Sequence, residues 1–151
     1  MTRILVVHGP NLNLLGRREP EIYGTTTLDT INEQLRDAAR EAGVEVEILQ
    51  SNHEGEIVDF LNQGLGRVDG LILNAAAYTH YSVAIRDAVT ALGVPSVEVH
   101  LTNIHAREGF RKRSLMAPVV TGQVVGLGAY GYVLALQGLL HFLAGKGCKT
   151  S

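Results

Sequence analysis

Gly70-Leu71-Ile72-Leu73-Asn74 is the segment that indicates the fold most clearly. Its unbroken apolar run is typical of a central strand that is covered on both faces, as the strands of parallel sheets are. On either side of it, four further segments have strand character and alternate with helical patterns. The expected strands are residues 3–7, 44–48, 70–73, 95–99 and 119–125. This alternation predicts an α/β fold with a doubly wound, five-stranded parallel sheet.

Apolar residues at helical spacing mark a helix after each of the first three strands and after the last. We expect the first helix to begin at Thr26 or Thr27, and the fold to be flavodoxin-like in class. The last helix, residues 129–144, is apolar most of the way round, and we expect it to pack against another subunit. The other three expected core stripes are Leu28, Ile31, Leu35, Ala38 and Ala42; Ile57, Phe60, Leu61 and Leu65; and Ile85, Ala88, Val89 and Leu92.

Composition limits the class of protein. A chain of 151 residues predicts one domain, residues 1–151, and a formal net charge of −2 argues against a general nucleic-acid binder. The one cysteine, Cys148, can form neither an internal disulfide nor a Cys-His zinc site. No signal-like or membrane-spanning segment is recognisable, so we expect a cytoplasmic protein. The first lysine is Lys112, which leaves no Schiff-base lysine on an early core strand.

Functional side chains are expected at the carboxyl ends of the strands, where doubly wound sheets bind their ligands. Two long loops lie there, residues 9–26 and 101–117, and loops of that length are usually functional. We expect polar side chains from these loops and strand ends to meet in one crevice. They include Asn11, Arg18, Tyr23, Asn74, His80, His100, Thr102 and Arg111.

Glu98 is the most informative single residue. It alternates with Val97 and Val99 and therefore shares a strand face with His100. On a covered strand an ionised Glu is costly unless it is paired, so we expect Glu98 to hold the His100 imidazole and support its charged form. The alternative is that this strand is a sheet edge with one face in water.

Tyr23 and Arg18 share the first long loop. A nearby guanidinium would favour the phenolate of Tyr23 and make it a usable base. The alternative is a tyrosine that packs as part of a lid while Arg18 stays in water.

The other candidates also have structural readings. Asn11 can bind a ligand or simply form a turn, and His80 can bind a ligand or cap the third helix. Arg111 can bind an anion or belong to a solvated basic loop. Asn74 ends a central strand, where a ligand contact is the favoured reading. His80 and His100 have no third ligand at a sensible spacing, so no metal site is expected.

Gly126-Leu127-Gly128-Ala129-Tyr130-Gly131 matches a dinucleotide-binding pattern, but no strand follows its helix and no acidic residue lies downstream. We therefore interpret these glycines as allowing close packing of the last helix. Two rival functions remain open: a flavodoxin-like module that binds a nucleotide or flavin, and an interaction protein that recruits a partner through the last helix.

Several segments together resemble the type II 3-dehydroquinate dehydratases over about residues 3–143. They are Gly9-Pro10-Asn11-Leu12-Asn13-Leu14-Leu15-Gly16, Arg18-Glu19-Pro20 with Tyr23-Gly24, Tyr78-Thr79-His80 with Ser82-Val83-Ala84, Arg86-Asp87-Ala88, Glu98-Val99-His100-Leu101, Asn103-Ile104-His105-Ala106-Arg107-Glu108 with Phe110-Arg111, and Gly126-Leu127-Gly128-Ala129. The resemblance implies dehydration of 3-dehydroquinate to 3-dehydroshikimate in the shikimate pathway, through an enolate, without cofactor or Schiff base.

The resemblance also implies roles for individual residues. Tyr23, kept ionised by Arg18, would take the C2 proton, and a water held by Asn11 would stabilise the enolate. His100, oriented by Glu98, would protonate the departing C1 hydroxyl. The implied substrate-binding residues are Asn74, His80 and Arg111 for the ring hydroxyls, the backbone N–H groups of Leu101 and Thr102 for the carboxylate, and Asp87 from a neighbouring subunit in trimers that assemble into dodecamers.

The chain departs from the family pattern at a few positions. Asn74 is followed by Ala75-Ala76-Ala77 where glycine is usual, so we expect a shift of the backbone beside the substrate. Tyr81, Thr102 and His8 also replace the usual residues. None of these changes removes an implied catalytic group.

Overall fold

The structure is a computed structural model that describes residues 1–145, except for the side chain of Tyr23. Cys148 lies outside the described residues, as do the last two lysines. Within residues 1–145, no helix is long and apolar enough to cross a membrane.

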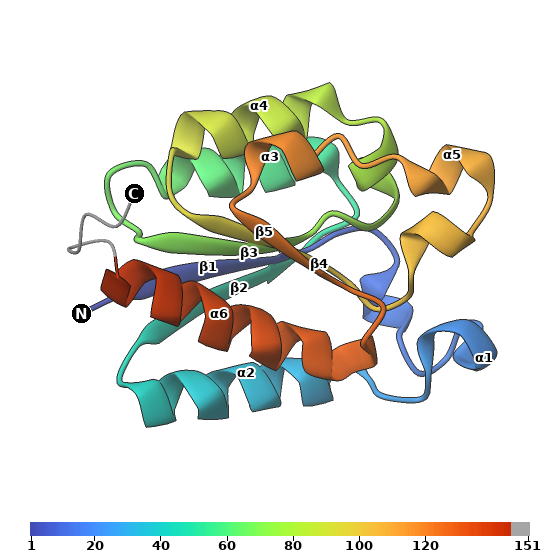
Figure 1. Cartoon of the computed structure of the whole chain (residues 1–151), viewed down its shortest axis with the longest axis horizontal. Helices are drawn as coiled ribbons and strands as arrows, with labels where there is room; N and C mark the ends of the chain where they lie inside the picture. Colours follow the sequence, from blue (N-terminus) through green and yellow to red (C-terminus); the bar gives the residue numbers. More distant parts are fainter. Residues whose placement is uncertain (146–151) are drawn as a thin grey trace.

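The centre of the molecule is a five-stranded, wholly parallel sheet in the order β2-β1-β3-β4-β5 (Figure 1). The strands are β1 (Arg3–His8), β2 (Glu45–Gln50), β3 (Gly70–Asn74), β4 (Ser96–His100) and β5 (Gly122–Val125). The predicted flavodoxin-like fold is confirmed. Because β4 lies between β3 and β5 and is buried along its whole length, the reading of this strand as a wet edge is wrong.

Two helices cover each face of the sheet (Figure 1). On one face lie α2 (Leu28–Ala42) and α6 (Gly131–Gly145), and on the other α3 (Glu54–Gln63) and α4 (Val83–Leu92). Thr27 caps α2 by accepting from the N–H of Thr30, as predicted for one of the two threonines. Two short helices, α1 (Pro20–Tyr23) and α5 (Gly109–Lys112), lie in the two long loops at one end of the sheet.

The core has two halves, one on each face of the sheet. Leu71 and Leu73 of β3 face the α3–α4 side, and Ile72 faces the α2–α6 side. All three side chains are fully buried, and burial of such a side chain is worth roughly 1.5–3 kcal/mol. The unbroken apolar run of this strand is therefore explained by cover on both faces.

The expected element boundaries and core positions need four corrections. The chain from Ala117 to Val119 is a short 3-10 helix, so the fifth strand begins only at Gly122. Helix α3 ends at Gln63, which leaves Leu65 beyond it and exposed. In α2 the buried position of the last turns is Ala39; Ala38 is half-buried and Ala42 is exposed. The last helix begins at Gly131 after a 3-10 turn.

The glycines before and at the start of α6 are explained by two different structural requirements. Gly126 and Gly128 have φ values of +88° and +68°, which favour glycine whatever the packing. Gly131 lies close to β5, because a Cβ atom there would be 3.3 Å from Cγ1 of Val124. Close packing of the last helix, predicted for all of these glycines, therefore explains Gly131 alone.

Candidate active site

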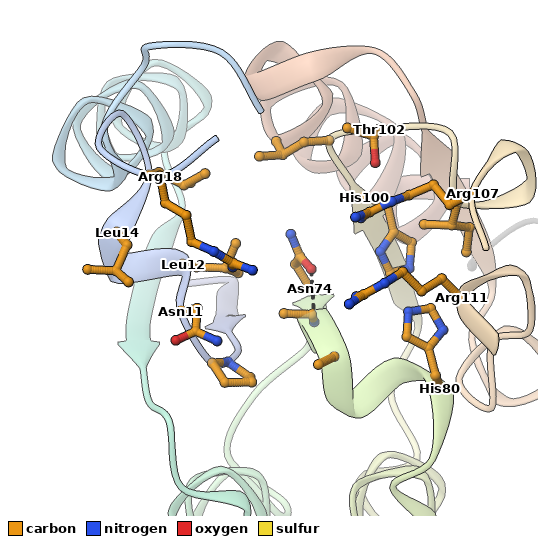
Figure 2. Close-up of a pocket in the computed structure, with 16 residues that line it drawn as sticks. Asn11, Leu12, Leu14, Arg18, Asn74, His80, His100, Thr102, Arg107 and Arg111 are labelled. Atoms are coloured by element: carbon orange, nitrogen blue, oxygen red, sulfur yellow. Dashed lines mark hydrogen bonds between the residues drawn. The ribbon is translucent and has the colours of Figure 1, made fainter. Parts of the chain in front are cut away.

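A cavity of about 140 Å³ opens at the carboxyl ends of β1, β3 and β4, between the two long loops. Figure 2 shows Asn11 and Arg18 on one side, His80, His100, Arg107 and Arg111 on the other, and Asn74 between them. The predicted convergence is confirmed for these residues and Thr102. The polar lining consists of Asn11, Arg18, Asn74, His80, His100, Thr102, Arg107 and Arg111.

His100, which lines the pocket, forms a buried pair with Glu98 on β4. Nε2 of His100 lies 2.5 Å from Oε2 of Glu98, and both side chains are almost completely buried. The predicted pairing is confirmed. Since the carboxylate occupies Nε2, the imidazole is held in one orientation while it lines the pocket.

Two more side chains bind Glu98. Ser114 donates its hydroxyl to Oε2 over 2.7 Å, and Gln123 donates Nε2–H to Oε1 over 2.7 Å. Burial raises the pKa of Glu98, but the hydrogen bonds from His100, Ser114 and Gln123 and the charge on the imidazole outweigh burial and hold the pKa below its usual value. Glu98 is therefore a buried carboxylate that stays charged.

Neither of these partners of Glu98 was predicted from the sequence. Gln123 lies directly beside Glu98 in the register of β4 and β5, so a polar residue inside an apolar last strand was a usable signal. Ser114 lies in a loop, and nothing in its sequence context indicates that it reaches Glu98.

Asn74 lies at the centre of the pocket floor, at the end of β3 (Figure 2). Its Oδ1 accepts the N–H of Ala76 over 3.1 Å, and its Nδ2 donates to the hydroxyl of Tyr132 over 3.0 Å. Ala76 has a left-handed φ of +51°, a conformation that usually belongs to glycine. The turn after β3 thus has a left-handed position although alanine replaces the usual glycine.

His80 contributes a second imidazole to the pocket. Its Nδ1 lies 2.7 Å from the carbonyl of Arg113, which can only accept, so Nδ1 carries the proton. Nε2 is then the remaining site for a ligand. The prediction that His80 caps the third helix is wrong, because Ser82 is the cap of α4 and accepts from the N–H of Ile85.

Three guanidinium groups point into the pocket, from Arg18, Arg107 and Arg111 (Figure 2). Nε of Arg111 forms an ion pair of 2.9 Å with Glu108, and the nearest carboxylate to Arg18 is that of Glu19 at 3.9 Å. No acidic side chain of the described residues lines the pocket. The cavity is therefore electropositive and suits a small anion.

Asn11 is held by the shape of its own loop. Its φ of 68° is left-handed, a conformation that asparagine tolerates, and its N–H donates to Oδ1 of Asn52 over 3.0 Å. The turn interpretation of Asn11 therefore holds, and the same residue lines the pocket.

Leu101 and Thr102 lie at the pocket rim, directly after β4. The N–H of Gly126 donates to the carbonyl of His100 over 3.0 Å, and that of Gly128 donates to the carbonyl of Leu101 over 2.9 Å. These bonds fasten the turn after β4 to the turn after β5.

One predicted site residue does not line this pocket, and the placement of a second stays a prediction. Asp87 is exposed on α4 and does not line it, so a role for Asp87 requires another subunit. Tyr23 ends α1, and its side chain lies outside the described part of the structure. Among the described residues, no group of three or more His, Cys, Asp or Glu side chains could hold a metal ion.

Comparison with known proteins identifies the family. Residues 2–140 match the model of the family described as dehydroquinase class II. This chain belongs to the class II dehydroquinases. It is 57% identical over 140 residues to a 3-dehydroquinate dehydratase of Acaryochloris marina, covering 93% of this chain and 94% of the relative. It is 54% identical over 149 residues to one of Ruegeria pomeroyi, covering 99% and 100%.

Solved structures agree with this assignment. The type II dehydroquinase of Butyrivibrio crossotus has a TM-score of 0.90 and 42% identity, covering 92% of this chain and 97% of that chain. A type II dehydroquinase of Propionibacterium acnes has a TM-score of 0.89 and 45% identity, covering 93% and 97%. This class II dehydroquinase therefore shares both sequence and backbone with structurally characterised members of its family.

Proposed function

We propose that this chain is a type II 3-dehydroquinate dehydratase of the shikimate pathway. It removes water from 3-dehydroquinate and forms 3-dehydroshikimate without a cofactor. The observation that carries the proposal is the His100 imidazole, backed by the buried carboxylate of Glu98, in a pocket that three guanidinium groups make electropositive. The pocket thus combines a proton donor with a site for a small carboxylic acid.

The substrate is a polyhydroxylated cyclic acid, and the lining suits it. Its carboxylate lies at the turn after β4, against the backbone N–H groups of Leu101 and Thr102. Its ring hydroxyls bind Asn74, His80 and Arg111. This placement is supported by the position of all five residues around one cavity.

The reaction begins with loss of a proton from C2, next to the ketone. Tyr23 is the base, and Arg18, an arginine of the same loop, stabilises its phenolate. Negative charge then develops on the ketone oxygen, and a water held by Asn11 donates to it. The position of Asn11 and Arg18 on the same side of the cavity supports this assignment.

The second half of the reaction is loss of the C1 hydroxyl. His100 gives that hydroxyl a proton, so that it leaves as water while the C1–C2 double bond forms. Glu98 stabilises the imidazolium and keeps the ring in place. The 2.5 Å pair of Nε2 and Oε2 supports this role.

We also propose a single catalytic domain over residues 1–151, an assembly of identical subunits and a location in the cytoplasm. The assembly is a trimer that forms dodecamers, in which Asp87 of one subunit reaches the substrate of the next. The exposure of Asp87 on α4 supports this placement.

Adding 3-dehydroquinate to the purified protein tests the proposal. The product contains a conjugated enone, so the ultraviolet absorbance of the mixture should rise. Turnover should also survive treatment of the protein with borohydride in the presence of substrate, because no imine forms. A protein that produces no enone, or that borohydride inactivates in the presence of substrate, contradicts the proposal.

A further inference from the structure

Behind the pocket floor, four polar side chains from four different elements form a row. Nε2 of His8 lies 2.8 Å from Oδ1 of Asn32, and Nδ1 of His8 lies 3.0 Å from the hydroxyl of Tyr132. That hydroxyl is 3.0 Å from Nδ2 of Asn74. His8, Tyr132 and Asn74 are buried on β1, α6 and β3, and Asn32 lies on α2. The reaction proposed above uses only Asn74.

The chemistry of these groups determines where each proton lies. Oδ1 of Asn74 accepts the N–H of Ala76, so the amide cannot be flipped and Nδ2 must donate to Tyr132. The single phenol proton of Tyr132 then goes to Nδ1 of His8. His8 carries its own proton on Nε2 and donates it to Oδ1 of Asn32. Every bond in the row is satisfied in this direction.

The opposite direction leaves a buried donor without an acceptor. If Nδ1 of His8 carried the proton, the Tyr132 oxygen would receive hydrogens from both His8 and Asn74. Its own proton would then face a buried region with neither neighbour able to accept it, and an unsatisfied buried donor is destabilising. Burial also lowers the pKa of His8 to about 4, which keeps the ring neutral and Nδ1 able to accept.

We propose that Asn32, His8 and Tyr132 are positioning residues, which form a one-way hydrogen-bond chain that fixes the Asn74 amide in the pocket. Tyr132 is the one acceptor among the described residues that Nδ2 reaches. The second N–H of Asn74 therefore remains for a ligand, and the atom it binds is an oxygen that accepts. In the proposed reaction, on which this part of the inference rests, that atom is a ring hydroxyl oxygen.

A double-mutant cycle tests whether Tyr132 acts through Asn74. Tyr132→Phe should lower kcat/KM for 3-dehydroquinate about five- to tenfold, mainly through KM, because one buried hydrogen bond to the binding amide is lost. In the Asn74→Ala background the same change should have no further effect. Tyr130→Phe, two residues earlier and exposed, is the matched control and should leave kcat/KM unchanged. Equal losses in both backgrounds would overturn the proposal.

A second measurement does not depend on activity and reads the unaltered chain of bonds in the wild-type protein, with one variant used only to assign a signal. The ¹⁵N spectrum of the wild-type histidines should show His8 as a neutral ring with its proton on Nε2, from neutral pH down to about pH 5, with the signal assigned by its loss in His8→Asn. A proton on Nδ1, or a charged ring at pH 6, would overturn the proposal. If the wild type fails to dehydrate 3-dehydroquinate, the proposed function falls, and the spectrum still decides the direction of the bonds.

Discussion

His8 and His100 occupy equivalent places in the fold, since each is the last residue of a buried parallel strand. Their partners differ. His8 lies between an amide and a phenol, both neutral, and burial lowers its pKa to about 4. His100 faces the buried carboxylate of Glu98. The fold thus supplies one neutral imidazole that organises hydrogen bonds and one imidazole whose charged form has a counterion.

A similar contrast separates two tyrosines and gives the largest expected effect. Burial raises the pKa of the Tyr132 phenol, which therefore stays protonated and cannot be a base. Tyr23 is the proposed base, so Tyr23→Phe should lower kcat by about 10²–10⁴-fold, measured from enone absorbance. If Tyr132→Phe lowers kcat as much as Tyr23→Phe does, the assignment of different roles to the two tyrosines is wrong.

The neutral state of His8 predicts a pH dependence of stability. In the unfolded chain His8 binds a proton with a pKa of 6.5, whereas in the folded protein it does so only at about pH 4. The free energy of unfolding should therefore fall by about 3 kcal/mol as the pH falls from above 6.5 to 4. Glu98 acts in a different window: its lowered pKa stabilises the fold above 4.5, and that contribution is lost only at lower pH.

Urea unfolding at several pH values measures this effect. His8→Asn should show a flatter curve than the wild type between pH 6.5 and 4, because the titrating group is gone. Parallel curves for the two proteins in that window would mean that His8 is not held neutral by the fold.

On the other strand, Glu98→Gln keeps the shape of the side chain and removes its charge. A hydrogen bond to a charged group is worth about 1.5–3 kcal/mol, so kcat should fall roughly 10–100-fold as the imidazolium loses its counterion. Glu47→Gln is the control: Glu47 is paired with Arg67 on the surface, and its loss should leave kcat unchanged. If both variants turn over at the wild-type rate, the buried pair has no catalytic value.

Ser114→Ala gives the smallest effect. Its oxygen accepts the N–H groups of Met116 and Ala117, so its proton is directed to Glu98. Loss of that bond should cost about 1 kcal/mol and lower kcat about fivefold. Ser96→Ala removes a hydroxyl at the opposite end of β4 and should affect stability alone. A drop in kcat for Ser96→Ala matching that of Ser114→Ala would refute a specific role for Ser114.

The sequence predicted contacts that depend on local periodicity. The pairing of Glu98 with His100 follows from two residues on one face of one strand, and the burial of β3 follows from its apolar run. Contacts between distant elements were not predictable. Tyr132 reaches Asn74 only because α6 packs against β3 and β4, and Ser114 reaches Glu98 only through the course of its loop.

Some predictions from local sequence patterns were wrong, because the same pattern can arise from different structural causes. Leu65 continues the helical spacing of α3 but lies beyond the end of the helix. Gly126 and Gly131 belong to one motif, yet the first is explained by a positive φ and the second by close packing. Asp87 and Tyr23 remain predictions, because one requires a second subunit and the side chain of the other is outside the described structure.

The most direct test compares the two histidines in a single enone assay with 3-dehydroquinate. We expect His100→Ala to lose about 10²–10⁴-fold in kcat, whereas His8→Asn should retain kcat within about tenfold of the wild type. Equal losses in the two variants, or wild-type turnover in His100→Ala, would contradict the assignment of the proton donor to β4.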